Sequence, residues 1–301
     1  MPAQGHDMID RYYSTTKPTQ VRGGDAVCVE TRNHPRLRAA VMNTRFLLPT
    51  AWRVTFLHGP QNAAYAQREL ASVPGVRLLP LLQVERRIFA DANAEASGYR
   101  DAFDYSRRTN WYNRMLATST SFWRLFNSEY VLIFELDAAL CKAPSRPIDS
   151  FKGFALVGAP WPNQRCCNSG LSMWHRASML RIVSTRGHAY PGKHIDSWAA
   201  GELLALHAAG LLGRPPVPSV AIASAFSVEQ LWAGNVTPVG VHSAHRFLKG
   251  AALSELARRC PALCALFPSP NQAPATCGAK SNLVHGAKSR MLNHSATPYQ
   301  K

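Results

Sequence analysis

The chain has 301 residues, of which 46% are hydrophobic and 17% are charged, so its composition excludes a disordered chain. Lysine and arginine number 34 against 18 acidic residues, which gives a formal net charge of +16. This charge predicts anionic partners, and it does not choose among phosphate-bearing ligands, nucleic acid and anionic membranes.

The basic residues are spread along the chain instead of being gathered in one run. A nucleic-acid-binding protein concentrates such residues on one face or along one helix. We therefore do not expect nucleic acid as a partner, and we interpret the excess charge as a generally basic, solvated surface.

The sequence carries no signal of membrane insertion. No stretch approaches the ~20 apolar residues that a transmembrane helix needs. Residues 1–18 lack the apolar centre of a signal peptide. From these patterns we expect a soluble chain, cytoplasmic by default, and we leave the secretory pathway open.

The chain contains 7 cysteines, an odd number without regular spacing. Such a pattern argues against a full disulfide framework. We expect most of the thiols to be small core residues or spare surface thiols.

Strand and helix patterns alternate in the first part of the chain. Residues 26–31 and 52–59 are predicted strands, residues 34–49 and 62–73 predicted helices, and residues 76–82 a third strand. This alternation indicates βαβ units and a mainly parallel sheet.

Further elements follow a more polar segment, residues 83–106, which we expect to be loop with a short helix. Aromatic residues at helical intervals predict a core-facing helix over residues 111–127. Residues 130–136 and 154–163 are predicted strands, and residues 194–210 are a predicted helix.

We expect three segments in the chain: a lead-in over residues 1–24, one α/β domain over residues 25–268, and a basic, disordered tail over residues 269–301. The tail is rich in Ala, Ser and Gly and shows little periodicity. No Gly-x-Gly-x-x-Gly sequence follows the first strand, which argues against a classical dinucleotide-binding domain.

Two acids, Glu135 and Asp137, follow the apolar strand of residues 130–134. In extended backbone, residues two apart point to the same side, so the two carboxylates are expected to aim together. Paired carboxylates repel unless a cation lies between them, and Mg²⁺ and Mn²⁺ prefer oxygen ligands and bridge to phosphates. The alternative is structural: Asp137 caps a helix that begins at Ala138, and Glu135 pairs with an arginine.

Seven short segments of the chain form an ordered pattern: Val29–Leu37, Glu135-Leu136-Asp137, Gly158–Trp161, Asn168–Trp174, Ile195-Asp196, Phe226–Glu229 and Gly240–His242. In this order they resemble the DUF5672 family, whose members resemble GT-A nucleotide-sugar glycosyltransferases. The resemblance covers about residues 26–250. The resemblance implies a GT-A-like, Rossmann-like sheet flanked by helices in a single domain.

The resemblance also implies a function and a site. A sugar would move from a nucleotide-sugar donor to a hydroxyl acceptor, with Mn²⁺ or Mg²⁺ as cofactor. Asp137, Glu135 and His242 would bind the metal, although His245 leaves the histidine assignment open. Asp196 would be the catalytic base, and its structural alternative is a helix cap.

Other matched residues have weaker implied roles. Asn168, Ser169 and Gly170 would form a turn against the donor, or an ordinary turn. Trp161 would stack on an acceptor sugar or fill the core. Glu229 would support the site or make a structural ion pair.

The sequence also departs from the family pattern. Ile195 replaces an acidic residue, Trp174 replaces an arginine, and Ser169 replaces a glycine. The first two losses motivate a second hypothesis, a catalytically inactive carbohydrate-binding relative. Charge alone motivates a third, a basic nucleic-acid-binding protein.

Overall fold

The structure is a computed structural model that describes residues 23–81, 108–163, 166–192, 194–232, 234–267 and 275–277. The predicted loop over residues 83–106 and nearly all of the predicted lead-in and tail lie outside these residues. The predicted domain boundaries therefore stay predictions.

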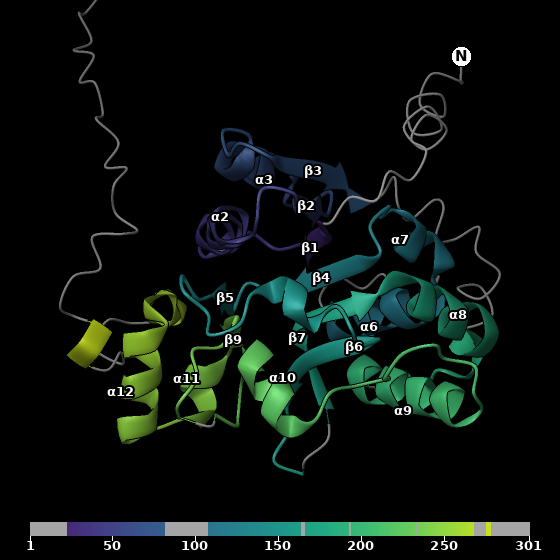
Figure 1. The fold of residues 1–301 in the computed structure, drawn as a ribbon. Helices are drawn as coiled ribbons and strands as arrows, with labels where there is room; N and C mark the ends of the chain where they lie inside the picture. Colours follow the sequence, from purple (N-terminus) through teal and green to yellow (C-terminus); the bar gives the residue numbers. More distant parts are fainter. Residues whose placement is uncertain are drawn as a thin grey trace, which may run out of the picture.

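A central sheet of six strands runs in the order β3-β2-β1-β4-β7-β6 (Figure 1). The strands are β1 (Asp25–Glu30), β2 (Arg53–His58), β3 (Val76–Pro80), β4 (Tyr130–Phe134), β6 (Leu156–Pro160) and β7 (Cys166–His175). Strands β3, β2, β1 and β4 run parallel to one another, whereas β7 is antiparallel to both β4 and β6. The prediction of a mixed α/β fold with a mainly parallel sheet is confirmed.

Helices cover both faces of this sheet, as its alternating side chains require. Val27 and Val29 of β1 point to a cluster shared with α6 (Arg108–Thr118), α7 (Thr120–Arg124), α8 (Arg176–Arg186) and α9 (Ile195–Ala208). Ala26 and Cys28 point to the opposite cluster, shared with α2 (Leu37–Leu47), α3 (Ala63–Leu70) and α10 (Val220–Phe226). Both faces of the sheet are therefore buried.

The predicted helix over residues 111–127 is divided in the structure. α6 ends at Thr118, and the Ser119 side chain accepts a hydrogen bond from the Phe122 backbone N–H at 3.0 Å. A serine that caps in this way begins a new helix, α7, because it satisfies a backbone donor that has no partner within the helix. The sequence pattern indicated the buried aromatic residues and missed the break.

A second, smaller sheet lies beyond the carboxyl end of β4. It has the order β5-β9-β8, with β5 (Ala138–Leu140), β8 (Ser227–Val228) and β9 (Gly240–His242). The C-terminal helices pack beside it, away from α8 and α9 (Figure 1). They are α11 (Ala244–Phe247), α12 (Gly250–Arg259) and the 3₁₀ turns at Pro261–Leu266 and Ala275–Cys277. Further 3₁₀ turns span Ile148–Phe151 and Gly187–Ala189.

The expectation for the cysteines was wrong. Cys141 and Cys260 form a disulfide with an S–S distance of 2.07 Å, and Cys264 pairs with Cys277 at the same distance. The sulfur atoms of the adjacent Cys166 and Cys167 also meet. Spacing alone did not predict the Cys141–Cys260 pair, because residues 119 positions apart meet only when the C-terminal helices dock.

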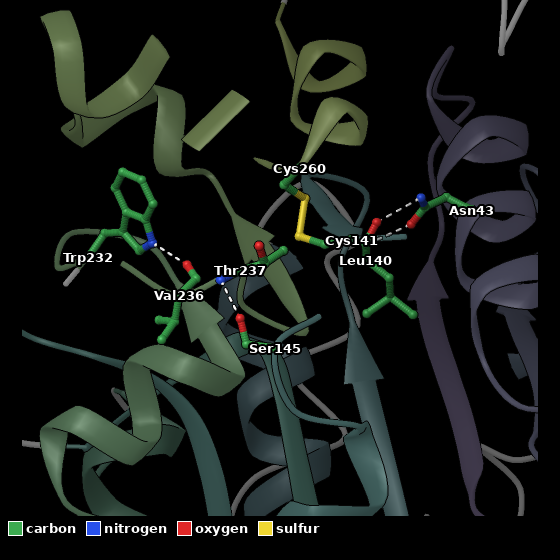
Figure 2. Close-up of a disulfide and its surroundings, with 8 residues drawn as sticks. All are labelled: Asn43, Leu140, Cys141, Ser145, Trp232, Val236, Thr237 and Cys260. Carbon is green, nitrogen blue, oxygen red and sulfur yellow. Dashed lines mark hydrogen bonds between the residues drawn. A yellow bond between two sulfur atoms is a disulfide. The ribbon is translucent and has the colours of Figure 1, made fainter. Parts of the chain in front are cut away.

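The Cys141–Cys260 disulfide joins the end of β5 to the end of α12 (Figure 2). On its other side, β5 is held by Asn43 of α2, whose side-chain amide accepts from the Leu140 N–H at 2.7 Å and donates to the Leu140 carbonyl at 3.1 Å. The small sheet is therefore attached both to the C-terminal helices and to the main domain.

None of the described helices is long and apolar enough to cross a membrane.

We expect the double substitution Cys141→Ala/Cys260→Ala to lower the free energy of unfolding by about 2–5 kcal/mol. The lost cross-link closes a sequence separation of 119 residues, against 13 for the other long-range pair. The matched control Cys264→Ala/Cys277→Ala should cost less, because a short loop loses less entropy on closure. Chemical denaturation measures both variants, and an equal loss in both would contradict the argument.

Candidate active site

The Glu135–Asp137 segment is a tight turn between β4 and β5. The Ala138 N–H donates to the Glu135 carbonyl at 3.0 Å, so the chain reverses there instead of remaining extended. The predicted reason for the two acids to aim together, strand alternation, was therefore wrong. Their side chains are 23% and 19% exposed, so the acidic turn is neither sealed inside the protein nor fully solvated.

His242 brings the two acids together. It ends β9, directly opposite Ala138 of β5. Its Nε2 atom lies 3.3 Å from Oδ1 of Asp137 and 3.9 Å from Oε2 of Glu135. The potential ligand atoms of Glu135, Asp137 and His242 all lie within 4.8 Å of one another. The second sheet thus assembles residues that are more than 100 positions apart in the chain.

Gly170 of β7 makes room for the imidazole. A Cβ atom at this position would overlap the Nε2, Cε1 and Cδ2 atoms of His242. The absence of a side chain at Gly170 therefore allows the ring to lie against β7 with its Nε2 atom toward the acids.

Charge balance sets the protonation of this cluster. Burial disfavours a charged imidazole, but polar contacts with Asp137 and Glu229 and the charge of Glu135 outweigh it and raise the pKa of His242 to about 10. Burial also disfavours a charged Asp137, but His242, Ser243 and Arg246 outweigh it and hold the pKa of Asp137 well below its usual range. Ser243 donates to Oδ2 of Asp137 at 2.6 Å.

The donor set fits a divalent cation. Two carboxylates and one imidazole converge, and a protonated imidazole supplies positive charge beside the two acids. Carboxylate oxygens suit Mg²⁺ and Mn²⁺, while imidazole suits transition metals, so the mixed set fits Mn²⁺ better than Mg²⁺. Metal binding requires a neutral imidazole, so a metal and a proton would compete for His242.

A cavity of about 220 Å³ opens beside this cluster. Its lining includes six predicted site residues: Glu135, Asn168, Ser169, Gly170, Asp196 and His242. It lies beyond the carboxyl end of β4, where open α/β sheets bind their ligands. The structure therefore brings together predicted residues from four separate segments of the sequence.

Asp196 reaches the cavity from the first turn of α9. Its carboxylate accepts a hydrogen bond from the Ser197 backbone N–H at 2.8 Å. Burial raises the pKa of Asp196, while backbone hydrogen bonds from Ser197 and Ser169 and the charge of His194 partly oppose the shift. Asp196 is not the N-cap residue of α9, a position that His194 occupies.

Sequence reasoning missed four residues of the cavity lining: Tyr112, Asn113, His194 and Ile195. Tyr112 and Asn113 belong to α6, which the sequence pattern assigned only to the core. His194 adopts a left-handed backbone conformation, with φ of 51°. Ile195 was noted only as a departure from the family pattern, and that departure was the one signal available.

Other residues that the sequence analysis singled out are absent from the lining of this cavity. Trp161 follows β6 and is half-buried, and it is absent from the described cavity wall. Glu229 is buried behind His242, with Oε1 3.4 Å from Nδ1 of the ring. Trp174 is fully buried in the core and donates to Ser172 at 2.6 Å, so its difference from the family pattern affects packing and not the cavity.

Basic side chains surround the acidic turn. Arg246 lies 3.4 Å from Oδ2 of Asp137. Burial and neighbouring cations that include Arg36 lower the pKa of His34 and His245, while Asp137 opposes both shifts. Lowered pKa values favour neutral His34 and His245, so the positive charge that an approaching anion meets outside the cluster is that of Arg246.

A second cavity, of about 240 Å³, lies at the opposite end of the sheet. Two of its three charged lining residues, Asp25 and Arg53, pair with each other at 2.7 Å, and Asp25 also accepts from the Ser128 N–H at 3.0 Å. The carboxylate of Asp25 therefore links β1 to β2. The cavity beside His242 is the better candidate site.

Comparison with known proteins supports the resemblance found in the sequence. Residues 101–242 match the family model described as Protein of unknown function (DUF5672). This match confirms the resemblance over that range, and the predicted opening segment Val29–Leu37 lies outside it. No curated protein matches the chain.

Comparison with solved structures also finds matches to this chain, among them the following two. Mouse xyloside xylosyltransferase 1, in its apo form, has a TM-score of 0.38 and 12% identity, over 66% of this chain and 79% of that chain. Core-mannan synthase A from Aspergillus fumigatus, in its Mn/GDP form, has a TM-score of 0.37 and 12% identity, over 77% of this chain and 82% of that chain. By name the first is a xylosyltransferase and the second is a mannan synthase.

Proposed function

We propose that this protein is a metal-dependent glycosyltransferase that moves a sugar from a nucleotide-sugar donor to a hydroxyl acceptor. The observation that carries the proposal is the meeting of Glu135, Asp137 and His242 at one edge of a cavity that Asp196 also lines. The family resemblance pointed to the same four residues, so sequence pattern and geometry support one site.

The metal-binding residues would hold the donor diphosphate. Mn²⁺ or Mg²⁺, when bound, neutralises negative charge on the leaving diphosphate as a Lewis acid. Asp137 presents Oδ1 toward His242, while Ser243 and Arg246 occupy the side of Oδ2. The carboxylate is therefore held in one orientation, which favours a pre-formed site.

Asp196 is proposed to accept the proton of the acceptor hydroxyl. Burial raises its pKa, which brings a carboxyl closer to the range in which a general base is most effective. Asp196 lines the same cavity as Glu135 and His242, so a sugar placed there would lie between the diphosphate and the base. The cavity is smaller than the ~300–1,000 Å³ typical of drug-sized ligands, which fits a single sugar ring.

The second candidate function is binding of a carbohydrate without catalysis. One observation favours it: Ile195, at a position where the family pattern has an acid, is buried and lines the cavity beside Asp196. Saturable donor binding without turnover, under any metal, would select this function over transfer.

We propose an oxidising compartment in place of the cytoplasmic default. Disulfides form and persist in secreted and extracellular proteins and in the endoplasmic reticulum, and they are rare in the cytosol. The Cys141–Cys260 and Cys264–Cys277 pairs support this placement.

Asp137→Asn should abolish metal-dependent chemistry. We expect nucleotide-sugar hydrolysis in the presence of Mn²⁺ to fall by about 100-fold or more, and Mn²⁺ affinity to fall with it, because one charged ligand is lost. A hydrolysis screen over nucleotide sugars, with and without Mn²⁺, measures the first effect. The control is Asp149→Asn, which alters an exposed acid paired with Lys152. Unchanged turnover in Asp137→Asn would remove the proposed function.

Asp196→Asn should slow transfer by about 10²–10⁴-fold while Mn²⁺ affinity stays the same, because the substitution removes a base and not a ligand. In the wild-type protein the base must be ionised, so transfer should fall as pH drops through the raised pKa of Asp196. This acidic limb of the pH–rate profile should be absent in the variant. A wild-type rate for Asp196→Asn would exclude the carboxylate as the base.

The compartment proposal predicts which thiols react in protein isolated from its native source. When free thiols are alkylated before reduction, Cys141, Cys260, Cys264 and Cys277 should remain unlabelled. Buried Cys28, which is not in a disulfide, should be labelled only after unfolding. Mass spectrometry of the peptides gives the result, and labelling of all four paired cysteines would refute an oxidising compartment.

A further inference from the structure

Glu229 is a buried acid whose surroundings are specific. Its Oε1 atom accepts from the Asn168 side chain at 3.2 Å and lies 3.4 Å from Nδ1 of His242. Its Oε2 atom accepts from Gln230 at 3.4 Å. Among the described residues, His242 is the one ionisable partner within ion-pair distance of Glu229. A buried carboxylate is costly without compensation, so this arrangement requires an explanation.

Strand pairing places Glu229 beside the imidazole. β8 is parallel to β9, with Val228 opposite Val241, so Glu229 and His242 follow at the same end of the two strands. β5 lies on the other side of β9, with Ala138 opposite His242. The ring therefore lies between an acid on the Nδ1 side and the acidic turn on the Nε2 side.

The Nδ1 atom of His242 is buried and makes no hydrogen bond among the described residues, and Oε1 of Glu229 is the acceptor that faces it. A hydrogen bond requires a distance of about 2.7–3.2 Å, so a small movement of either side chain would complete it. Metal-binding histidines usually donate their second ring N–H to a carboxylate or carbonyl, which fixes the tautomer and the ring orientation.

We infer that Glu229 is the positioning residue for His242: it accepts the Nδ1 proton, so that the Nε2 lone pair faces Glu135 and Asp137. The inference rests on the proposed metal-dependent function and deepens it. Glu229 does not contact the reacting atoms in this role. It acts through the imidazole.

Asn168 helps to hold Glu229 and Gly170 against the His242 ring. Its Nδ2 atom donates to Glu229, and its Oδ1 atom accepts from the Gly170 N–H at 2.8 Å. Gly170 in turn leaves the space that the His242 ring fills. Both ends of the Asn168 amide are therefore used within the protein, in holding the carboxylate and the glycine against the ring.

The test is Mn²⁺ binding alone, without nucleotide sugar, in variants at position 229. Glu229→Ala should weaken Mn²⁺ binding by about 10–100-fold, as the loss of such a partner typically does. Glu229→Gln should stay within a few-fold of wild type, because its amide oxygen still accepts the Nδ1 proton. The control variant is Glu202→Ala, which removes an acid of α9 that pairs with Arg186 at the end of α8. Equal affinity in wild type and Glu229→Ala, or equal weakening in both variants, would overturn the inference.

A second measurement uses the wild-type protein, so it does not depend on whether a variant folds. In ¹⁵N-histidine-labelled wild-type protein with Mg²⁺, Nδ1 of His242 should carry the proton and Nε2 should be the unprotonated nitrogen. The reverse tautomer would refute the role of Glu229. If the proposed metal-dependent function itself were wrong, Asp137→Asn would leave Mn²⁺ binding unchanged. This result distinguishes failure of the function from failure of the Glu229 role.

Discussion

The imidazole of His242 lies within 4 Å of three carboxylates, those of Glu135, Asp137 and Glu229, and the site depends on that concentration of negative charge. Three acids around one partly buried point are unstable without a cation. A protonated imidazole supplies it, and under the proposed function a divalent ion on the Nε2 side would supply it instead. Stability and the proposed metal binding thus depend on the same electrostatic requirement.

The small sheet is what makes this arrangement possible. Asp137 precedes β5, His242 ends β9 and Glu229 follows β8, so three short strands carry three of the four groups. Strands of two or three residues have little stability of their own. The Asn43 contacts, the Cys141–Cys260 disulfide and the packed C-terminal helices hold them in place. Those distant elements therefore support the candidate site although none of them is among the described lining residues of the cavity.

The sequence predicted the α/β class well, because alternating strand and helix patterns are local. It also located Glu135, Asp137, Asn168, Gly170 and Asp196, which line the cavity or meet at its edge. Its reason for the acids was wrong, since a turn and not a strand orients them. The break at Ser119 was missed although its cap is local. The cavity-lining face of α6 and the Cys141–Cys260 pair were missed because they depend on neighbours distant in the chain.

The sequence by itself determined which residue types were available, the alternation of strands and helices that builds the main sheet, and which segments resemble a known family. Only the tertiary structure decided that His242 and not His245 meets the acids, and that Glu229 stands behind the ring. The physical reason is strand register. A shift of one residue turns every side chain of a strand to the opposite face, and pairing across 100 positions sets that register. Local patterns carry no such information.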